Sequence, residues 1–172
     1  MTIVVVTSII AFDMKEIVTT AKSKAEKGGH GLDCPEEAAF LDLLRTTDML
    51  SRGLVKVLKR ERISSTQYNV LRILRGAPDG LPCGEIANRM ITRDPDVTRL
   101  LDRLEKRQLI SRCREDKDRR TVMAWITKEG LALLARLDEP VQTAHRKQLS
   151  HLGPERLHAL TELLREARTQ VM

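Results

Sequence analysis

Aromatic residues and cysteines are scarce in this sequence of 172 residues. Phe, Trp and Tyr together make up 2% of the chain, which disfavours a β-sandwich, because such a core usually depends on aromatic and β-branched side chains. Cys34, Cys83 and Cys113 lie far apart and form no C-x-x-C pair. Their number and spacing argue against a disulfide framework and against a zinc site. We therefore expect a helical protein that works in a reducing cytoplasm.

The N-terminus lacks a membrane-spanning segment. Its apolar run "IVVVTSIIAF" (3–12) is too short for a bilayer, and no basic residue precedes it, as a signal peptide would require. We interpret the run as an extra packed strand or helix, as a poorly ordered tail, or as a segment upstream of a natural start at Met14. The polar, glycine-containing stretch 23–33 is typical of a linker. We expect no membrane association, and we assign residues 1–33 to an N-terminal extension and linker.

Catalytic signatures are missing as well. The sequence contains no nucleophile motif and no glycine-rich phosphate loop. Its histidines, His30, His145, His151 and His158, are scattered and have no acidic neighbours at metal-ligand spacing. We therefore expect a protein that is not an enzyme and that needs no cofactor or metal.

Charge and leucine are abundant. The charged fraction is 31% and the formal net charge is +6, a balance that favours a polyanionic partner such as nucleic acid, although many basic proteins bind nothing acidic. Hydrophobic periodicity and capping signals predict the order helix, helix, strand, helix, helix, strand, strand, helix, helix. The expected ranges are 35–61, 64–75, 81–83, 84–91, 94–108, 109–114 and 121–126, followed by a helix capped by Thr127 and a last helix that begins at 153–156.

The middle of this order, 63–127, is that of a winged helix-turn-helix, so the expected fold is mainly α with a winged core. The helices that flank it have apolar stripes too long to bury against so small a unit. We expect them to pack on each other or on a second copy of the chain. We therefore assign 34–62 to an N-terminal dimerisation helix and 128–172 to C-terminal dimerisation helices. The first of the latter carries Leu131, Leu134, Leu137 and Val141 as its apolar residues.

The fourth helix, expected to be capped by Asp94, has the features of a DNA-recognition helix. Its apolar residues point to the core, while Arg99 and Arg103 share the opposite face and Thr98 lies beside them near the N-terminus. Arg can bond guanine O6 and N7, and Thr can bond a base edge or pack on a thymine methyl. The alternative is an ordinary surface helix with a solvated charged face.

The second helix begins with a cluster of hydroxyl groups. Ser64 and Gln67 have the spacing of a capping box. Ser65 and Thr66 follow Ser64, and hydroxyls beside free backbone N–H groups at a helix start suit a phosphate. Simple N-capping by Ser64 is the alternative, and both roles are compatible if Ser65 or Thr66 makes the phosphate contact.

The charged stretch "EDKDRR" (115–120) separates the two expected strands, which makes it the tip of a hairpin. Its formal charges sum to zero, so it is a poor general phosphate patch. A narrow tip with an arginine can enter a minor groove, and we expect Arg120 to do so with Asp118 holding it in place. Lys117 and Arg119 are expected to contact phosphates. The alternative is a solvated turn.

The segment "VTRLLDRLEKRQLISRCREDKDRRTVMAWITKEG" (97–130), with "STQYNVLRIL" (65–74) and "GEIANRM" (84–90), resembles the MarR family of winged-helix regulators. The resemblance extends over residues 35–171. It implies an obligate homodimer, held by the first and the last two helices, that binds a pseudo-palindromic operator in double-stranded DNA. It also implies that Thr98, Arg99 and Arg103 reach bases or phosphates and that Arg120, steadied by Asp118, enters the minor groove.

By the same resemblance the protein is a transcriptional regulator, a repressor, that a small aromatic or phenolic ligand releases from DNA. Gln108 stands where the family usually has Gly after the recognition helix, so we expect either a strained left-handed residue there or a reshaped turn. Two alternatives remain open. One is a winged module for protein–protein contact. The other is a redox sensor that uses Cys34, although Cys34 lies just before the first helix and has no tyrosine partner nearby.

Overall fold

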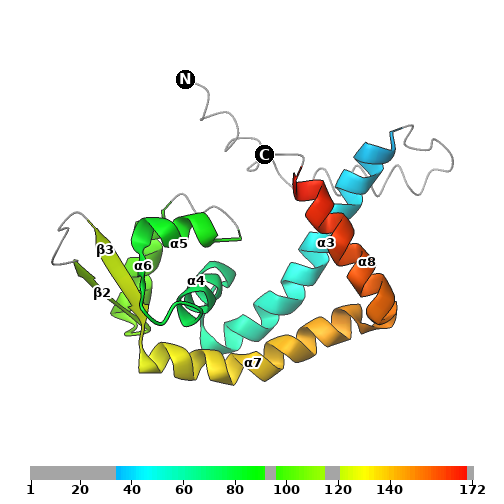
Figure 1. Ribbon diagram of the computed structural model, residues 1–172. Helices are drawn as coiled ribbons and strands as arrows, with labels where there is room; N and C mark the ends of the chain where they lie inside the picture. The colour runs from blue at the N-terminus through cyan, green and yellow to red at the C-terminus, as the bar shows by residue number, and fades with distance from the viewer. Residues whose placement is uncertain (1–33, 92–95, 115–120, 170–172) are drawn as a thin grey trace. The chain divides into compact units, whose positions relative to one another are not determined.

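The computed structural model describes residues 34–91, 96–114 and 121–169 (Figure 1). The chain divides into two compact units, 1–49 and 50–172, which are described separately. The order of elements confirms the expected mainly helical winged-helix fold. The elements are α3 (Pro35–Leu58), the 3-10 turn η1 (Lys59–Glu61), α4 (Ser65–Arg75), β1 (Leu81–Pro82), α5 (Cys83–Arg89), α6 (Val97–Lys106), β2 (Ile110–Arg114), β3 (Val122–Ile126), α7 (Lys128–Leu149), the 3-10 turn η2 (Ser150–Leu152) and α8 (Gly153–Thr169).

The described part of the first unit is the beginning of α3. Pro35 occupies the first helical position, and Glu36 and Glu37 follow in the first turn, where acidic side chains complement the positive end of the helix dipole. Phe40 and Met49 are 59% and 58% exposed. This part of α3 is therefore an amphipathic helix whose apolar residues face solvent in the single chain.

The second unit contains a small antiparallel sheet with strand order β1-β3-β2. Ala124 of β3 is the central residue, because it pairs with Leu81 of β1 on one side and with Arg112 of β2 on the other. Trp125 donates a hydrogen bond from Nε1 to the carbonyl oxygen of Asp79 (3.0 Å). The neighbouring Gly80 has a φ of 81°, and a Cβ there would collide with the Trp125 indole. The turn before β1 and the strand β3 are thus fitted to each other.

The hydrophobic core of this unit joins α4, α5, α6, the sheet and the first half of α7. Among the described residues it contains no buried polar or charged side chain. Leu71, Leu74, Leu104 and Leu134 lie at its centre and are almost completely buried. In Figure 1 the strands β2 and β3 lie beside α6, and α6 contacts β2 while α4 contacts α7. The core therefore fixes α6 against both the wing strands and α4.

Helix α7 begins as expected. Thr127 caps it, because its hydroxyl accepts a hydrogen bond from the Gly130 N–H (3.1 Å). Leu131 of the expected apolar stripe is 42% exposed in the single chain, while Leu133 lies in the core at 3%. The start of α7 packs closely on the carbonyl of Leu109, where a Cβ on Gly130 would collide. The helix continues through Pro140.

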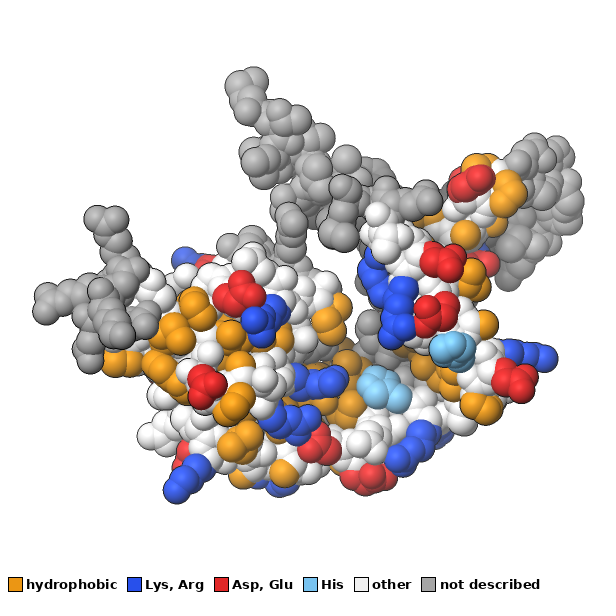
Figure 2. Space-filling model, in the orientation of Figure 1, with side chains coloured by type: hydrophobic (Ala, Val, Ile, Leu, Met, Phe, Trp, Pro, Cys, Tyr) orange, Lys and Arg blue, Asp and Glu red, His pale blue; other side chains and the backbone are white. Residues whose placement is uncertain are grey.

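Helix α8 has no buried residue. Leu160 and Leu163 are 37% and 63% exposed. Figure 2 shows apolar side chains at the surface among charged ones over the terminal helices. No helix in the described ranges has the length and apolar character needed to cross a membrane.

Candidate nucleic-acid interface

Helix α6 presents its basic residues outward because its apolar residues are anchored in the core. Leu100, Leu101 and Leu104 are 5%, 1% and 0% exposed. The predicted recognition residues Thr98, Arg99 and Arg103 are all exposed, and Arg103 lies one turn further along the helix than Arg99. The structure therefore confirms the amphipathic orientation on which the prediction of a recognition helix depends.

The expected cap of this helix was two residues too early. Asp96, and not Asp94, is the N-cap residue, and its side chain accepts a hydrogen bond from the Arg99 N–H (3.0 Å). The sequence "DPD" offers an aspartate on each side of Pro95, and both are residue types that favour the N-cap position. Asp94 and Pro95 lie outside the described residues.

The C-terminal end of α6 turns through a left-handed residue, which is the first of the two outcomes expected for this turn. Gln108 has a φ of 57°, a region in which residues with a Cβ are uncommon. The Leu109 N–H bonds the Leu104 carbonyl (3.0 Å), and the Gln108 carbonyl accepts a hydrogen bond from the Thr127 hydroxyl (2.7 Å). These contacts hold a sharp turn from α6 into β2 although Gln108 is not glycine.

The start of α4 is built as the sequence predicted. Ser64 Oγ accepts from the Gln67 N–H (3.1 Å) and Gln67 Oε1 accepts from the Ser64 N–H (3.1 Å), which completes the capping box. The Ser64 and Thr66 hydroxyls are also hydrogen-bonded to each other (2.9 Å). Ser65 is exposed and Thr66 is half-buried. The hydroxyl of Ser64 is therefore committed to the helix, while those of Ser65 and Thr66 remain near the surface.

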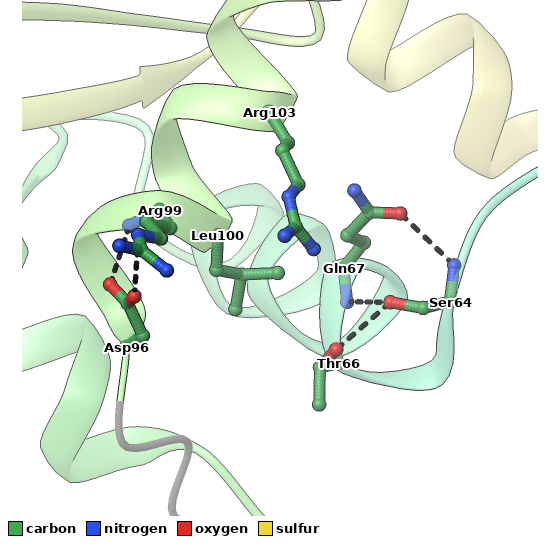
Figure 3. Close-up of a pocket in the computed structure, with 7 residues that line it drawn as sticks. All are labelled: Ser64, Thr66, Gln67, Asp96, Arg99, Leu100 and Arg103. Carbon is green, nitrogen blue, oxygen red and sulfur yellow. Dashed lines mark hydrogen bonds and ion pairs between the residues drawn. The ribbon is translucent and has the colours of Figure 1, made fainter.

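The beginnings of α4 and α6 enclose a shallow hollow, which we call the α4–α6 hollow (Figure 3). Its volume is about 340 Å³. It is lined by Ser64, Thr66, Gln67, Asp96, Arg99, Leu100 and Arg103. The structure thus brings together residues from two separate sequence predictions, the hydroxyl cluster of α4 and the arginines of α6. Arg103, the hydroxyl of Thr66 and the N-terminus of α4 supply donors suited to an anionic group such as a phosphate, while the Asp96 carboxylate, which also lines the hollow, is paired with Arg99.

A third arginine, Arg112 of β2, ties α6 to the wing. Its Nη2 lies 2.6 Å from Asp102 Oδ1 and 2.6 Å from Glu105 Oε2. Its Nε donates to Glu105 Oε2 (3.0 Å), and its backbone N–H donates to Glu105 Oε1 (3.1 Å). The hydrogen bonds that Arg112 donates to Glu105, and then the one that it donates to Asp102, raise the pKa of Arg112. We call this group of three residues the Arg112 clamp.

The sequence did not predict the Arg112 clamp. Asp102 was placed on the outer charged face of α6 by helical periodicity, and Arg112 belonged to a strand with no assigned partner. Arg112 and Glu105 are seven residues apart, across the turn at Gln108. A carboxylate in the last turn of a helix, followed by an arginine in the next strand, is the one signal that indicates such a pair. The clamp fixes the direction of β2 relative to the recognition helix.

The predicted tip of the wing cannot be placed in this arrangement. Lys117, Asp118, Arg119 and Arg120 lie outside the described residues, and the bracing of Arg120 by Asp118 stays a prediction. The strands that carry this tip are placed, because β2 and β3 pair from Ile110 with Ile126 to Arg114 with Val122. Arg114, which belongs to the last strand pair, and Thr121, which directly precedes its partner Val122, therefore lie at the same end of the two strands.

The described residues hold no cluster of His, Cys, Asp and Glu suited to a metal ion. Cys34 is exposed and its thiol donates to Glu36 Oε2 (3.2 Å). Burial, as the largest influence, raises the pKa of the Cys83 thiol, which lowers its reactivity as a thiolate. Cys113 is exposed on β2.

Comparison with known proteins identifies the family. The model of the MarR family matches residues 63–122. The HTH-type transcriptional regulator PecS of Dickeya dadantii is 32% identical over 124 residues, which are 71% of this chain and 75% of PecS. The chain belongs to the MarR family. Membership confirms the predicted class, a DNA-binding transcriptional regulator, and the prediction that the chain is not an enzyme.

Two further MarR-type relatives extend the comparison. The homoprotocatechuate degradative operon repressor of Escherichia coli is 30% identical over 130 residues, which are 76% of this chain and 87% of that repressor. The transcriptional repressor CouR, whose structure was solved bound to a 23-mer DNA duplex, is 29% identical with a TM-score of 0.71. That match covers 82% of this chain and 99% of the CouR chain.

Proposed function

We propose that this MarR-family protein is a repressor that binds a pseudo-palindromic operator as a homodimer. The α4–α6 hollow carries the proposal, because it places Arg99 and Arg103 beside the hydroxyl-rich start of α4. A backbone phosphate of the operator occupies the hollow, and the exposed N-terminal residues of α6 enter the adjacent major groove. The DNA-bound CouR repressor has the same fold, which supports this mode of docking.

The two arginines have different roles in this proposal. Arg103 lies one turn further along α6 than Arg99 and lines the hollow with Thr66, so we assign it to a phosphate, with Ser65 and Thr66 as further donors. Arg99 and Thr98 lie in the first turn of α6 and are exposed, so we assign them to base edges. These assignments follow the general division in which phosphate contacts set position and base contacts set sequence.

The wing completes the interface. Arg120 enters the minor groove with Asp118 as its brace, and Lys117 and Arg119 contact phosphates. These assignments rest on the sequence and on the position of the strand ends at Arg114 and Thr121. Replacing Arg120 by Ala is expected to weaken operator binding while leaving the dimer folded.

The terminal segments 34–62 and 128–172 form the dimer. Their exposed apolar side chains support this assignment, in particular Phe40 of α3 and Leu163 of α8. A second copy of the chain is the partner implied by a pseudo-palindromic operator, since each half-site then receives one α6. Because the chain acts on DNA, we place it in the cytoplasm. Residues 1–33 are an extension of this body.

Release by a small aromatic or phenolic acid is the regulatory part of the proposal. Its support is the relative that represses the homoprotocatechuate degradative operon. A ligand releases DNA only if it binds the DNA-free arrangement of the dimer more tightly than the bound one. Titration with homoprotocatechuate while DNA binding is monitored tests this class: release supports it, and unchanged binding at saturating concentrations contradicts it for this compound.

The salt dependence of binding tests the proposed function itself. Fluorescence anisotropy is measured with a random duplex and with a duplex from the intergenic region upstream of the protein's own gene, at several salt concentrations. Binding by phosphate contacts predicts a steep fall of log K with log salt, with a slope of about −0.9 for each phosphate contact. Replacing Arg103 by Ala is expected to reduce that slope by about 1 for each protomer.

Lys147→Ala is the matched control, because it also removes one exposed positive charge but lies on α7 away from the hollow. It is expected to leave the slope unchanged. A flat slope for the wild type would contradict DNA binding and favour the protein–protein alternative.

A further inference from the structure

Asp96 engages Arg99 with both of its carboxylate oxygens. Oδ1 accepts a hydrogen bond from the backbone N–H of Arg99 (3.0 Å), and Oδ2 lies 3.0 Å from Arg99 Nε. Figure 3 shows both contacts as dashed lines at the first turn of α6. The same carboxylate therefore caps the helix and fixes the direction in which the guanidinium leaves it.

We propose that Asp96 is a positioning residue that presents Arg99 to a guanine in the major groove. This inference rests on the proposed DNA-binding function and adds to it a specific base and a residue that acts through another. It does not require Asp96 to touch DNA.

The part of Arg99 that remains available determines the base. Nε is engaged by Asp96, while the Arg99 side chain is 78% exposed. Among the described residues no hydrogen bond is recorded for its Nη1 and Nη2 groups. These two groups form the end of the guanidinium fork, and their parallel N–H donors match the O6 and N7 acceptors of guanine. No other base offers two acceptors side by side in the major groove.

The pair also reduces the entropic cost of recognition. An exposed arginine normally samples many rotamers, and holding it still opposes binding. A carboxylate that binds Nε before DNA arrives removes part of that cost. The Asp96 carboxylate also places a negative charge beside the DNA major groove, and this charge disfavours general binding to phosphates. Asp96 should therefore increase the preference for one sequence while lowering the affinity for sequences that lack the guanine.

A purely structural role for Asp96 gives different expectations. If the residue only caps α6, any good cap at position 96 will preserve both the helix and its sequence preference. Asn and Ser are caps of similar quality to Asp. Asn carries no charge for Arg99, and Ser is too short to reach Nε. The variants Asp96→Asn and Asp96→Ser thus keep the cap and remove the pair, while Asp96→Ala removes both.

The experiment selects bound duplexes from a pool with a randomised central region. The full-length wild type, Asp96→Asn, Asp96→Ser, Arg99→Ala and the double variant Asp96→Asn with Arg99→Ala are each used. Anisotropy with the wild-type consensus and its single-base variants then gives the preference for guanine at each position. Thermal unfolding followed by circular dichroism reports whether the cap is kept.

The wild type is expected to require guanine at one position in each half-site. Asp96→Asn and Asp96→Ser should reduce that preference on the order of tenfold, with an unchanged unfolding temperature and a raised affinity for random duplex. In the Arg99→Ala background, Asp96→Asn should have no further effect on base preference, because the residue it positions is gone.

Glu129→Gln controls for charge alone, because it removes one exposed carboxylate from the first turn of α7. It should leave base preference unchanged. If Asp96→Asn and Asp96→Ser keep the full guanine preference of the wild type, or if their effect persists without Arg99, the positioning role is wrong while DNA binding stands. If the wild type selects no sequence at all, the proposed function fails and this inference fails with it.

Discussion

Helices α6 and α8 are both amphipathic, yet they differ completely in what their leucines contact. Helix α6 buries Leu100, Leu101 and Leu104 within its own chain, while α8, which is longer, has no buried residue. A helix that the chain packs by itself has a fixed direction before any partner arrives. A helix with an uncovered apolar stripe obtains most of its stability from a partner. The comparison separates the helix that we propose reads DNA from the helix that we propose packs on a second copy.

The largest effect is expected from the buried side of this comparison. Leu104 is completely buried at the centre of the core, so Leu104→Ala removes apolar contacts and leaves a cavity. We expect the free energy of unfolding to fall by about 2–5 kcal/mol, as measured by urea denaturation. A loss below about 1 kcal/mol would mean that α6 is not held by its leucine stripe.

The exposed side of the comparison is tested through the oligomeric state. Leu163 of α8 is 63% exposed in the single chain, so Leu163→Glu should leave each chain folded but place a charge in the dimer interface. We expect the dimer affinity to fall on the order of tenfold or more, as measured by sedimentation equilibrium. Ile91→Glu is the control: Ile91 is 84% exposed outside the terminal helices, and its replacement should leave the dimer intact. Dimers of unchanged affinity for Leu163→Glu would contradict the proposed interface.

A smaller effect is expected where α6 is held by charge. Arg112→Met removes the Arg112 clamp and leaves Asp102 and Glu105 without their shared partner. Both carboxylates are partly exposed to water, so the expected loss of stability is about 1–2 kcal/mol in urea denaturation. Arg112→Lys keeps the positive charge but lacks the planar fork of donors of the guanidinium. It should therefore recover only part of the lost stability. Full recovery by Lys would show that charge alone, and not the fork geometry, holds β2 to α6.

The smallest effect concerns the far end of α6, where pH provides the test. Arg107 donates to the Arg62 and Glu61 carbonyls, and the Glu61 side chain pairs with Arg136 (3.0 Å). The hydrogen bond from Arg136 lowers the pKa of Glu61 below its ordinary value of 4.5. A carboxylate with a lowered pKa stabilises the folded state above that ordinary value, and this contribution is lost as the pH falls through the folded-state pKa.

Thermal unfolding of the wild type and of Glu61→Gln, compared between neutral and acidic pH, measures this contribution. The wild type should have the higher unfolding temperature at neutral pH, and the gap should close on acidification. A gap that stays constant would assign the effect of the substitution to something other than the ion pair.

The sequence predicted the elements of α6 and its surroundings well because their signals are local. The capping box of Ser64 and Gln67 and the cap at Thr127 each depend on residues a few positions apart. The error at Asp94 is also local, since two aspartates flank one proline and only the structure selects between them. The conformation of Gln108 was left open between two outcomes, because it depends on how the turn packs between α6 and β2.

The Arg112 clamp and the pairing of Asp96 with Arg99 were not predicted, for two different reasons. The clamp depends on how β2 packs on α6, and the hydrophobic periodicity of a helix or a strand gives no information about that packing. The Asp96 pair was hidden by the wrong choice of cap. A similar brace was predicted for Asp118 and Arg120 in the wing, which lies outside the described residues. The sequence thus suggested that an aspartate holds an arginine in place in the wing. The structure shows a pair of this kind, Asp96 and Arg99, at the start of α6.

Trp125 is the single tryptophan of the chain, and its indole is bonded to the Asp79 carbonyl at the base of the wing. Its position makes it an intrinsic optical reporter. With excitation selective for tryptophan over Tyr68, a change in the emission spectrum of the unlabelled protein originates from this one ring. A shift in the emission wavelength on addition of a duplex or a phenolic acid will thus report on the contact between β3 and the turn at Gly80. It shows whether that contact opens or stays closed.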